Sequence, residues 1–185
     1  MRLLITFLSC FFILPIVLNI HAVHSKDFEL VGATLGSVNS IYVEGDCAYL
    51  CTGTVLVILD VRDPYNPVEL GRCFLPDFAN DLKVVGGYAY VAVGGGDKVC
   101  YSGLRIIDVS VPSDPKEVGF CRTPDLALGV HVLGGYAYVS AKGEGLRVID
   151  ISNPNAPREV GFEDFCTGSN CITKRKFFVR EMPLC

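Results

Sequence analysis

The sequence predicts an all-β, propeller-like fold with about three four-stranded antiparallel blades, one extra strand on the N-terminal side and an incomplete ring. Three observations lead to this prediction. An Ala-Tyr motif recurs three times in phase, an apolar run ending in aspartate follows each copy, and a proline-bracketed turn follows each run. Asp108 and Asp150, which end two of these runs, are 42 residues apart. A period of this length is typical of propeller blades.

Each unit begins with two strands joined by a tight turn. These turns are expected at Gly45-Asp46, Gly86-Gly87 and Gly134-Gly135. Glycine accepts the positive φ angles that a two-residue hairpin requires. The second strand of each unit carries the recurring motif, at residues 48–51, 89–92 and 137–140.

The third and fourth strands of each unit meet at the proline turn. The third strands are expected at residues 56–60, 104–108 and 146–150, and the fourth strands lead to Gly71, Gly119 and Gly161. Proline fixes φ and removes a backbone donor where the chain must reverse. The third strands place apolar side chains on both faces, as at Ile106 and Ile107. Each sheet therefore needs a neighbour on both sides, which stacked blades supply.

The chain divides into three parts. Residues 1–25 are predicted to be a signal peptide and residues 26–161 the repeats, at about 37–77, 78–125 and 126–161, whereas residues 162–185 form a tail that departs from the pattern. Residues 28–32 resemble the closing strand of an earlier unit. Closed propellers have about four to eight blades, so three explanations stay open. The chain is a fragment of a longer propeller, which we favour, or it forms an open arc, or copies associate to complete a ring.

The apolar segment at residues 3–20 indicates export. It contains no charge, follows the single basic residue Arg2 and precedes small residues suited to cleavage. An uncleaved membrane anchor is the alternative, because an apolar stretch of this length just spans a bilayer core of about 30 Å. We expect an extracellular, periplasmic or cell-surface protein that contacts a membrane only through an uncleaved leader.

The repeats resemble a known family. The Ala-Tyr-Val-Ala strand at residues 89–92, the Gly-Leu-Arg-Ile-Ile-Asp-Val-Ser strand at 103–110 and the Glu-Val-Gly strand at 117–119 are similar to the LVIVD repeat of exported, propeller-like proteins. The resemblance covers roughly residues 28–161. It implies β-propeller blades without assigned catalytic residues. Val57 departs from the pattern, because Arg105 and Arg147 occupy the equivalent position in the other two units.

Composition limits the classes of partner. The chain carries a formal charge of −4 with 50% hydrophobic residues, which argues against disorder and against a nucleic-acid partner. His131 is the only histidine after the leader, and no cysteine pair has the spacing of a zinc knuckle, so no metal or cofactor is expected. A protein or cell-surface partner is expected. Open blade faces would also permit self-association.

Eight cysteines follow the leader. In an exported protein an even number of cysteines indicates disulfides, and Cys166 and Cys171 are candidates for a local disulfide. Cys47 and Cys51 lie inside a strand pattern. The alternative for these two cysteines is a role as small apolar core residues.

Polar residues that recur in the repeats are interpreted as structural. Asp60, Asp108 and Asp150 are expected to accept backbone hydrogen bonds at the corner between strand and turn. Arg105 and Arg147 are expected to be paired, or to extend along the blade interfaces. Phosphate or carboxylate binding by these arginines is the alternative.

Three residues of the first strands are weak candidates for a ligand site: Asn80, Asp81 and His131. The first strand of a propeller blade lies close to the central axis, where many propellers bind ligands. No nucleophile aligns with His131, so no catalytic residue is assigned. The leading hypothesis is a non-enzymatic interaction or scaffold module of an exported or cell-surface protein. The alternative is a hydrolase or a metal-dependent ligand binder that uses the axial end.

Overall fold

The computed structural model describes residues 37–96 and 99–164, and all of these residues belong to one compact unit, Thr34–Cys185. They form twelve strands in three four-stranded antiparallel sheets, which we call blades 1, 2 and 3. Blade 1 contains β1 (Ser40–Glu44), β2 (Cys47–Thr52), β3 (Val55–Asp60) and β4 (Val68–Phe74). Blade 2 contains β5 (Ala79–Val85), β6 (Tyr88–Val93), β7 (Gly103–Asp108) and β8 (Lys116–Arg122). Blade 3 contains β9 (Ala127–Leu133), β10 (Tyr136–Ala141), β11 (Gly145–Asp150) and β12 (Arg158–Glu163).

The blades share one topology and one register. Each sheet follows chain order, and the motif tyrosines pair with equivalent residues of the third strand: Tyr49 with Ile58, Tyr90 with Ile106 and Tyr138 with Val148. Each third strand also has a register shift against the fourth strand at the same place. The expected hairpins are present, since the four residues of Gly86-Gly87 and Gly134-Gly135 all have φ between 59° and 81°. These features confirm the predicted all-β, blade-like fold.

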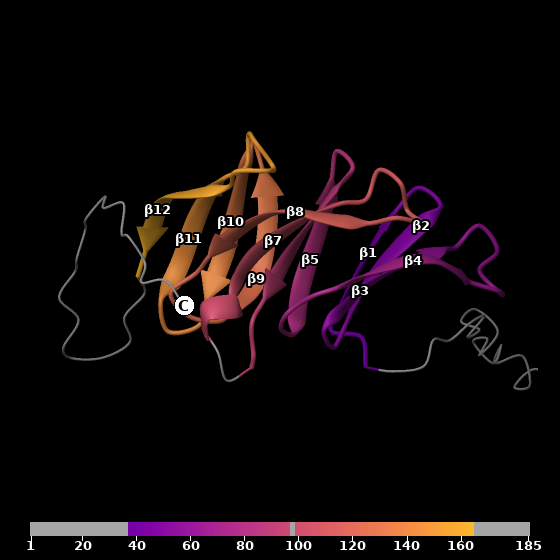
Figure 1. Cartoon of the computed structure of the whole chain (residues 1–185), viewed down its shortest axis with the longest axis horizontal. Coiled ribbons are helices and arrows are strands. Elements are labelled where there is room, and N and C mark those ends of the chain that lie inside the picture. The colour runs from indigo at the N-terminus through magenta and orange to yellow at the C-terminus, as the bar shows by residue number, and fades with distance from the viewer. Residues whose placement is uncertain (1–36, 97–98, 165–185) are drawn as a thin grey trace, which may run out of the picture. The chain divides into compact units, whose positions relative to one another are not determined.

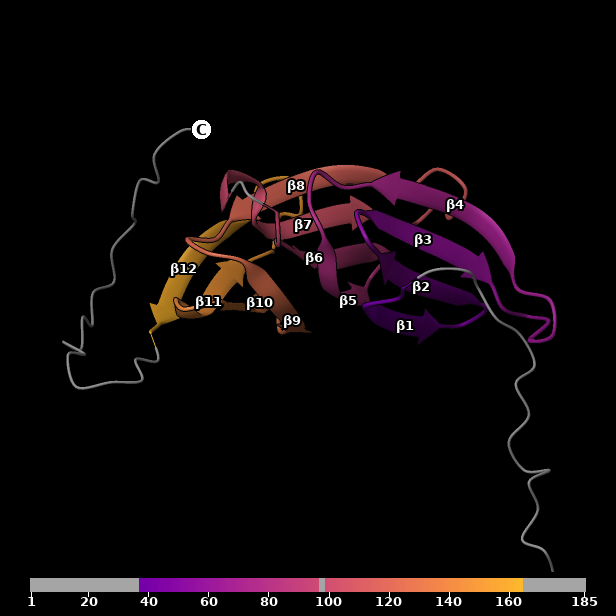
Figure 2. The same ribbon diagram turned by 90° about the horizontal axis from the view of Figure 1, so that it is seen from below.

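The blades lie side by side in chain order, with blade 2 between the other two (Figure 1). Figure 2 shows the same order from below, with blades 1 and 3 at opposite ends of the row. The first strand of the middle blade, β5, contacts the first strands of both neighbours, β1 and β9. The described residues do not close a ring. None of their helices has the length and apolar character needed to cross a membrane.

Each blade has two faces that differ in the neighbour they meet. We call the face toward the preceding blade the leading face and the face toward the following blade the trailing face. The leading face of blade 2 packs on blade 1 through Leu82, Val84, Ala89, Val91 and Ile107. Its trailing face packs on blade 3 through Tyr90, Ala92, Leu104 and Ile106. The side chains of Val91, Leu104, Ile106 and Ile107 are fully buried, so blade 2 depends on both neighbours.

A glycine contact fixes the outer edge of each junction. The proline turn of blade 2 reaches Gly71 of β4, where an added Cβ would lie 2.3 Å from the Pro112 carbonyl oxygen. The proline turn of blade 3 reaches Gly119 of β8 in the same way, at 2.0 Å from the Pro154 carbonyl oxygen. Only glycine permits these approaches. At the equivalent residue of blade 3, Gly161, an added Cβ would lie 3.9 Å from the Val148 Cβ.

The Gly119→Ala substitution is expected to lower the free energy of unfolding by about 1–3 kcal/mol, because a methyl group would overlap the Pro154 carbonyl and push blades 2 and 3 apart. The matched control is Gly161→Ala, whose methyl group would make only an ordinary contact with Val148 and should change the unfolding free energy little. Urea denaturation of dilute protein measures both. Equal effects of the two substitutions would contradict this account of the glycine contact.

Candidate interaction site

Asn80 and Asp81, two candidates from the sequence, bind the blades together. Asn80 Nδ2 donates to the Ala127 carbonyl of blade 3 at 2.8 Å. The Asp81 carboxylate accepts the Val130 N–H of blade 3 at 2.9 Å and the Ser40 hydroxyl of blade 1 at 2.8 Å. Asp81 therefore connects all three blades at their first strands. The fold uses the polar groups of both side chains.

His131, the third candidate, lies elsewhere. It is exposed in β9 and pairs with Tyr138 of β10. Its strand neighbours Val130 and Val132 pack toward blade 2. Because side chains alternate along a strand, His131 belongs to the trailing face of blade 3. The structure thus brings Asn80 and Asp81 to the junction of blades 2 and 3 and leaves His131 on the opposite side of blade 3.

The three corner aspartates have the predicted structural role. Asp60, Asp108 and Asp150 each accept the backbone N–H of the residue two positions later, at 3.0, 2.9 and 3.0 Å. The pKa of each carboxyl lies below its usual value. The largest cause is the hydrogen bond from the Arg62 side chain at Asp60, from the Ser110 hydroxyl at Asp108 and from the Ser152 backbone N–H at Asp150. Each aspartate therefore stabilises the start of its own proline turn.

Buried arginines form the second feature of the junctions. Arg105 Nη1 lies 2.6 Å from Glu117 Oε1, and its guanidinium carbon is 3.9 Å from the centroid of the Phe120 ring. Arg105 lies on the same face of β7 as Ile107, which packs on blade 1. The expectation of paired charges near blade interfaces is confirmed here. The acidic and aromatic partners on β8 were not part of that expectation.

Blade 3 repeats this arrangement with Arg147. Its Nη1 lies 3.7 Å from Glu159 Oε1, and its guanidinium carbon is 4.8 Å from the centroid of the Phe162 ring. Arg147 Nη2 also contacts Asp164 at 2.9 Å. Burial raises the pKa of the Glu159 carboxyl, and the neighbouring Arg147 partly offsets that rise. Arg147 therefore provides the charge that makes a buried Glu159 tolerable.

Blade 1 carries the same charges in a different order. Val57 occupies the arginine position of β3, while Arg72 of β4 occupies the position of Phe120 and Phe162. Arg72 pairs with Glu69, the equivalent of Glu117, through two hydrogen bonds of 2.6 Å. In blade 1 the arginine that pairs with the glutamate is therefore on the fourth strand, whereas in blades 2 and 3 it is on the third strand. This exchange explains why Val57 departs from the repeat pattern.

The described cysteines differ from the disulfide expectation. Cys47, Cys51, Cys73, Cys100 and Cys121 are free thiols. Desolvation by burial raises the pKa of Cys51 to about 12 and that of Cys121 to about 11. Cys47 and Cys51 belong to the core between blades 1 and 2, so the alternative role as core residues applies to them. The candidate pair Cys166 and Cys171 lies outside the described residues.

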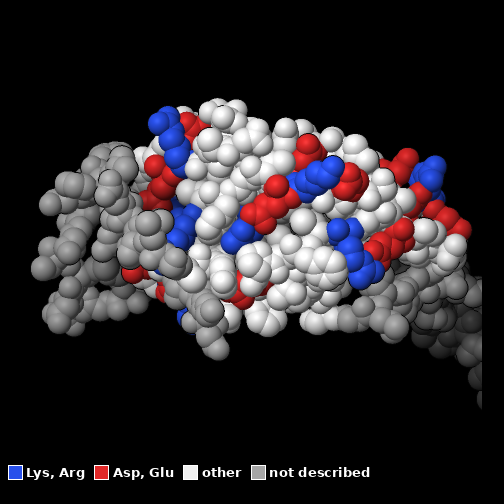
Figure 3. Space-filling model, viewed as in Figure 1, with Lys and Arg blue, Asp and Glu red and all other residues white. Residues whose placement is uncertain are grey.

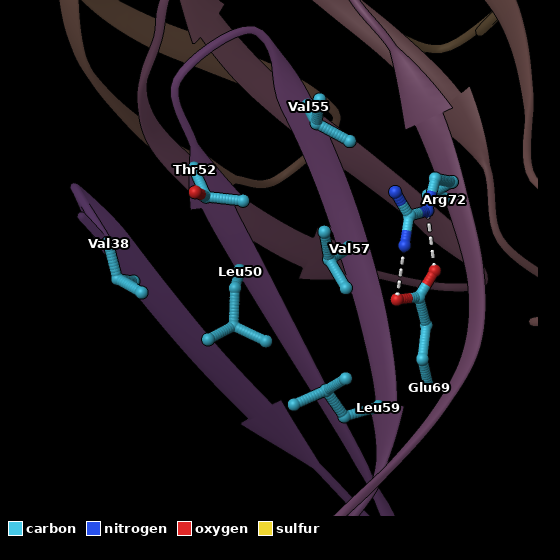
Figure 4. A pocket seen from close by; sticks show the side chains of 8 residues that line it. All are labelled: Val38, Leu50, Thr52, Val55, Val57, Leu59, Glu69 and Arg72. Carbon is cyan, nitrogen blue, oxygen red and sulfur yellow. Dashed lines mark hydrogen bonds and ion pairs between the residues drawn. The ribbon is translucent and has the colours of Figure 1, made fainter. Parts of the chain in front are cut away.

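The leading face of blade 1 carries an apolar groove of about 330 Å³ (Figure 4). It is lined by Val38, Leu50, Thr52, Val55, Val57, Leu59, Glu69 and Arg72. The apolar side chains come mainly from β2 and β3, and the Glu69–Arg72 ion pair borders the groove on the β4 side. The equivalent faces of blades 2 and 3 each pack on a preceding blade.

The trailing face of blade 3 is the second surface on which no described blade packs. Among its apolar side chains, Leu133, Tyr136 and Val160 are exposed, while Leu146 and Val148 are half-buried.

The charged side chains of the surface are mixed in sign. The face visible in Figure 3 has basic and acidic side chains next to one another, with uncharged side chains between them. The pairs Arg72–Glu69 and Lys116–Asp114 show the same mixing.

The Arg147→Met substitution is expected to lower the free energy of unfolding by about 3 kcal/mol, because Glu159 would remain partly buried without its cation. The double substitution Arg147→Met with Glu159→Met should recover most of this loss, since it removes both charges. Urea denaturation of the three proteins tests the expectation. A double variant no more stable than the single variant would show that the pairing is not the cause.

Asp108 should make the stability depend on pH. Its folded pKa lies below its ordinary value of 3.8, so it stabilises the fold above pH 3.8 and loses this effect as pH falls through the lower folded value. The Asp108→Asn variant lacks this titration. Wild type is therefore expected to have the higher melting temperature near neutral pH, and the difference should shrink in acid. Thermal melts of both proteins over a pH series measure it, and a constant difference would contradict the assignment.

Comparison with protein families agrees with the repeated geometry. The model of the LVIVD repeat matches residues 35–74, 78–123 and 126–163, one match for each blade. A search of curated proteins gives no significant match. The three matches cover well over half of the chain and follow the three sheets in order. The chain therefore belongs to the LVIVD repeat family.

Proposed function

We propose that this chain is a non-enzymatic interaction module of an exported or cell-surface protein, and that it binds another protein through its two uncovered blade faces. The leading face of blade 1 carries this proposal. Its equivalents in blades 2 and 3 are buried between sheets, whereas in blade 1 the same kind of face forms an apolar groove. Exposed apolar surface of this kind marks sites of protein contact. The exported setting rests on the apolar segment at residues 3–20.

The positions of the candidate ligand residues also support an interaction role. A hydrolase or a metal-dependent binder at the axial end would need Asn80, Asp81 and His131 to converge. Asn80 and Asp81 instead donate to and accept from the backbone of blade 3, and His131 lies on the other side of that blade. The recurring polar residues are likewise engaged in the fold, as with the corner aspartates and the buried arginines.

Site-specific photo-crosslinking in the cells that make the protein tests the interaction role. A photoreactive side chain at Val57 or at Leu133 is expected to form adducts with a protein that mass spectrometry can identify. The same group at Lys142, which is exposed in the turn between β10 and β11, is the matched control and should give few adducts. Labelling of equal strength from Lys142 would count against a role for the two faces.

Activity measurements test the non-enzymatic part of the proposal. The purified chain is expected not to turn over a panel of glycosides, esters and lactones. Turnover that disappears in His131→Ala or Asp81→Asn would favour the axial alternative and overturn the proposal.

A further inference from the structure

Among the described residues, the same kind of junction occurs twice, and the two outer blades each have one face that no described blade covers. The trailing face of blade 1 meets the leading face of blade 2, and the trailing face of blade 2 meets the leading face of blade 3. The two remaining faces are the leading face of blade 1 and the trailing face of blade 3. Each internal junction joins one trailing face to one leading face. Because the blades are repeats of one another, the two remaining faces are expected to fit together in the same way.

Exposure of apolar side chains shows that no described blade covers the leading face of blade 1. Ile41 and Val43 of β1 are 60% and 55% exposed. Their equivalents in β5, Leu82 and Val84, are 4% and 1% exposed because blade 1 covers them. The registers are the same, since Ile41 pairs with Leu50 as Leu82 pairs with Val91.

The trailing face of blade 3 shows the reciprocal difference. Leu104 and Ile106 of blade 2 are fully buried under blade 3. Their equivalents in β11, Leu146 and Val148, are only half-buried. Val160 of β12 is exposed.

The two parts of the glycine contact, a glycine of the fourth strand and a proline turn, are each present once without the other. The glycine is at blade 3 and the turn is at blade 1. Within the described part of the chain, no proline turn lies against Gly161, unlike Gly71 and Gly119. The unused turn is residues 63–67 of blade 1. It has the same internal hydrogen bond as the two turns in use, from the Asn66 N–H to the Asp63 carbonyl at 3.2 Å. Both the glycine surface and the turn that fits it are therefore already formed.

We propose that a second copy of this chain covers both faces. The trailing face of blade 3 in one copy packs on the leading face of blade 1 in the other, with the turn at residues 63–67 seated against Gly161. This inference rests on the proposed interaction function and names its partner. The three described blades of each copy make six in a dimer, within the range of about four to eight for closed propellers, whereas three copies would exceed it. The resulting ring contains two identical junctions related by a twofold axis.

The junction between copies lacks one contact of the internal junctions. Asn39 and Asn80 each donate to a backbone carbonyl of the next blade, at 2.9 and 2.8 Å. Leu128, which is 45% exposed, occupies their position in blade 3 and cannot donate. Apolar burial and the glycine contact must therefore hold the copies together. The dimer is expected to dissociate on dilution.

Analytical ultracentrifugation of the full chain over a concentration series measures the monomer–dimer equilibrium and tests the proposal. Two variants each disrupt one of the two faces. Gly161→Ala places a methyl group where the turn at residues 63–67 must seat. Ile41→Lys places a charge on the leading face of blade 1. Wild type is expected to form dimers, and each variant should keep a native circular dichroism spectrum while its dimer dissociation constant rises about tenfold or more.

Mixing the two variants distinguishes this arrangement from a dimer that pairs identical faces. Each variant retains the face that the other has lost, so a mixed dimer has one intact junction. Dimers should reappear in the mixture at concentrations where neither variant forms them alone. In the crosslinking experiment, Val57 of one copy should link to β11 or β12 of another.

A wild-type chain that stays monomeric at every concentration would overturn the proposal, as would dimers that neither substitution weakens, or a mixture that stays monomeric. Failure of this inference can be told apart from failure of the proposed function. If Val57 crosslinks a different protein while the chain remains monomeric, only the second copy is ruled out. If Val57 and Leu133 give no adducts at all, both proposals fall.

Discussion

Burial of both faces of each four-stranded sheet is the constraint on which this structure depends. Strand β6 shows it most clearly, because every residue from Ala89 to Val93 is buried although successive side chains point to opposite faces. A sheet of this kind cannot have one face in water and one on a core. It must lie between two other sheets, and the junctions between blades are where the recurring residues meet their partners.

The junctions combine apolar contact with a small number of polar interactions that repeat with each blade. The arginine of the third strand, the glutamate of the fourth strand and a phenylalanine form one unit in blades 2 and 3. In blade 1 the pair of Val57 and Arg72 replaces the pair of arginine and phenylalanine, and Glu69 keeps its cation. A glutamate of the fourth strand paired with an arginine is thus common to the three blades, and the strand that supplies the arginine can change.

The repeat and its local chemistry could be predicted from sequence because they depend on residues close together in the chain. The glycine hairpins, the strands that end in Asp60, Asp108 and Asp150, and the hydrogen bonds of those aspartates are all local. The roles of Asn80 and Asp81 could not be predicted, because their partners Ala127 and Val130 lie on another blade.

The different position of the arginine in blade 1 is partly visible in the sequence. Val57 stands out when the three units are aligned. Its explanation requires the register between β3 and β4, which aligns Arg72 with the phenylalanines of the other blades. A core role for Cys51 was one of the two alternatives, whereas the free thiol of Cys121 was not predicted, because the parity of cysteines says nothing about distance. The two residues pack in different junctions, one on each side of blade 2.

Blade 2 contributes to both apolar cores, and this position determines the order in which the blades unfold locally. Detaching blade 1 or blade 3 exposes one core, whereas opening blade 2 requires that both be exposed. In a stack held together by nearest neighbours, the free energy of local opening is therefore lowest at the two outer sheets and highest in the middle. Amide hydrogens of β6 and β7 should be the last to exchange with solvent, and fraying should proceed inward from the ends.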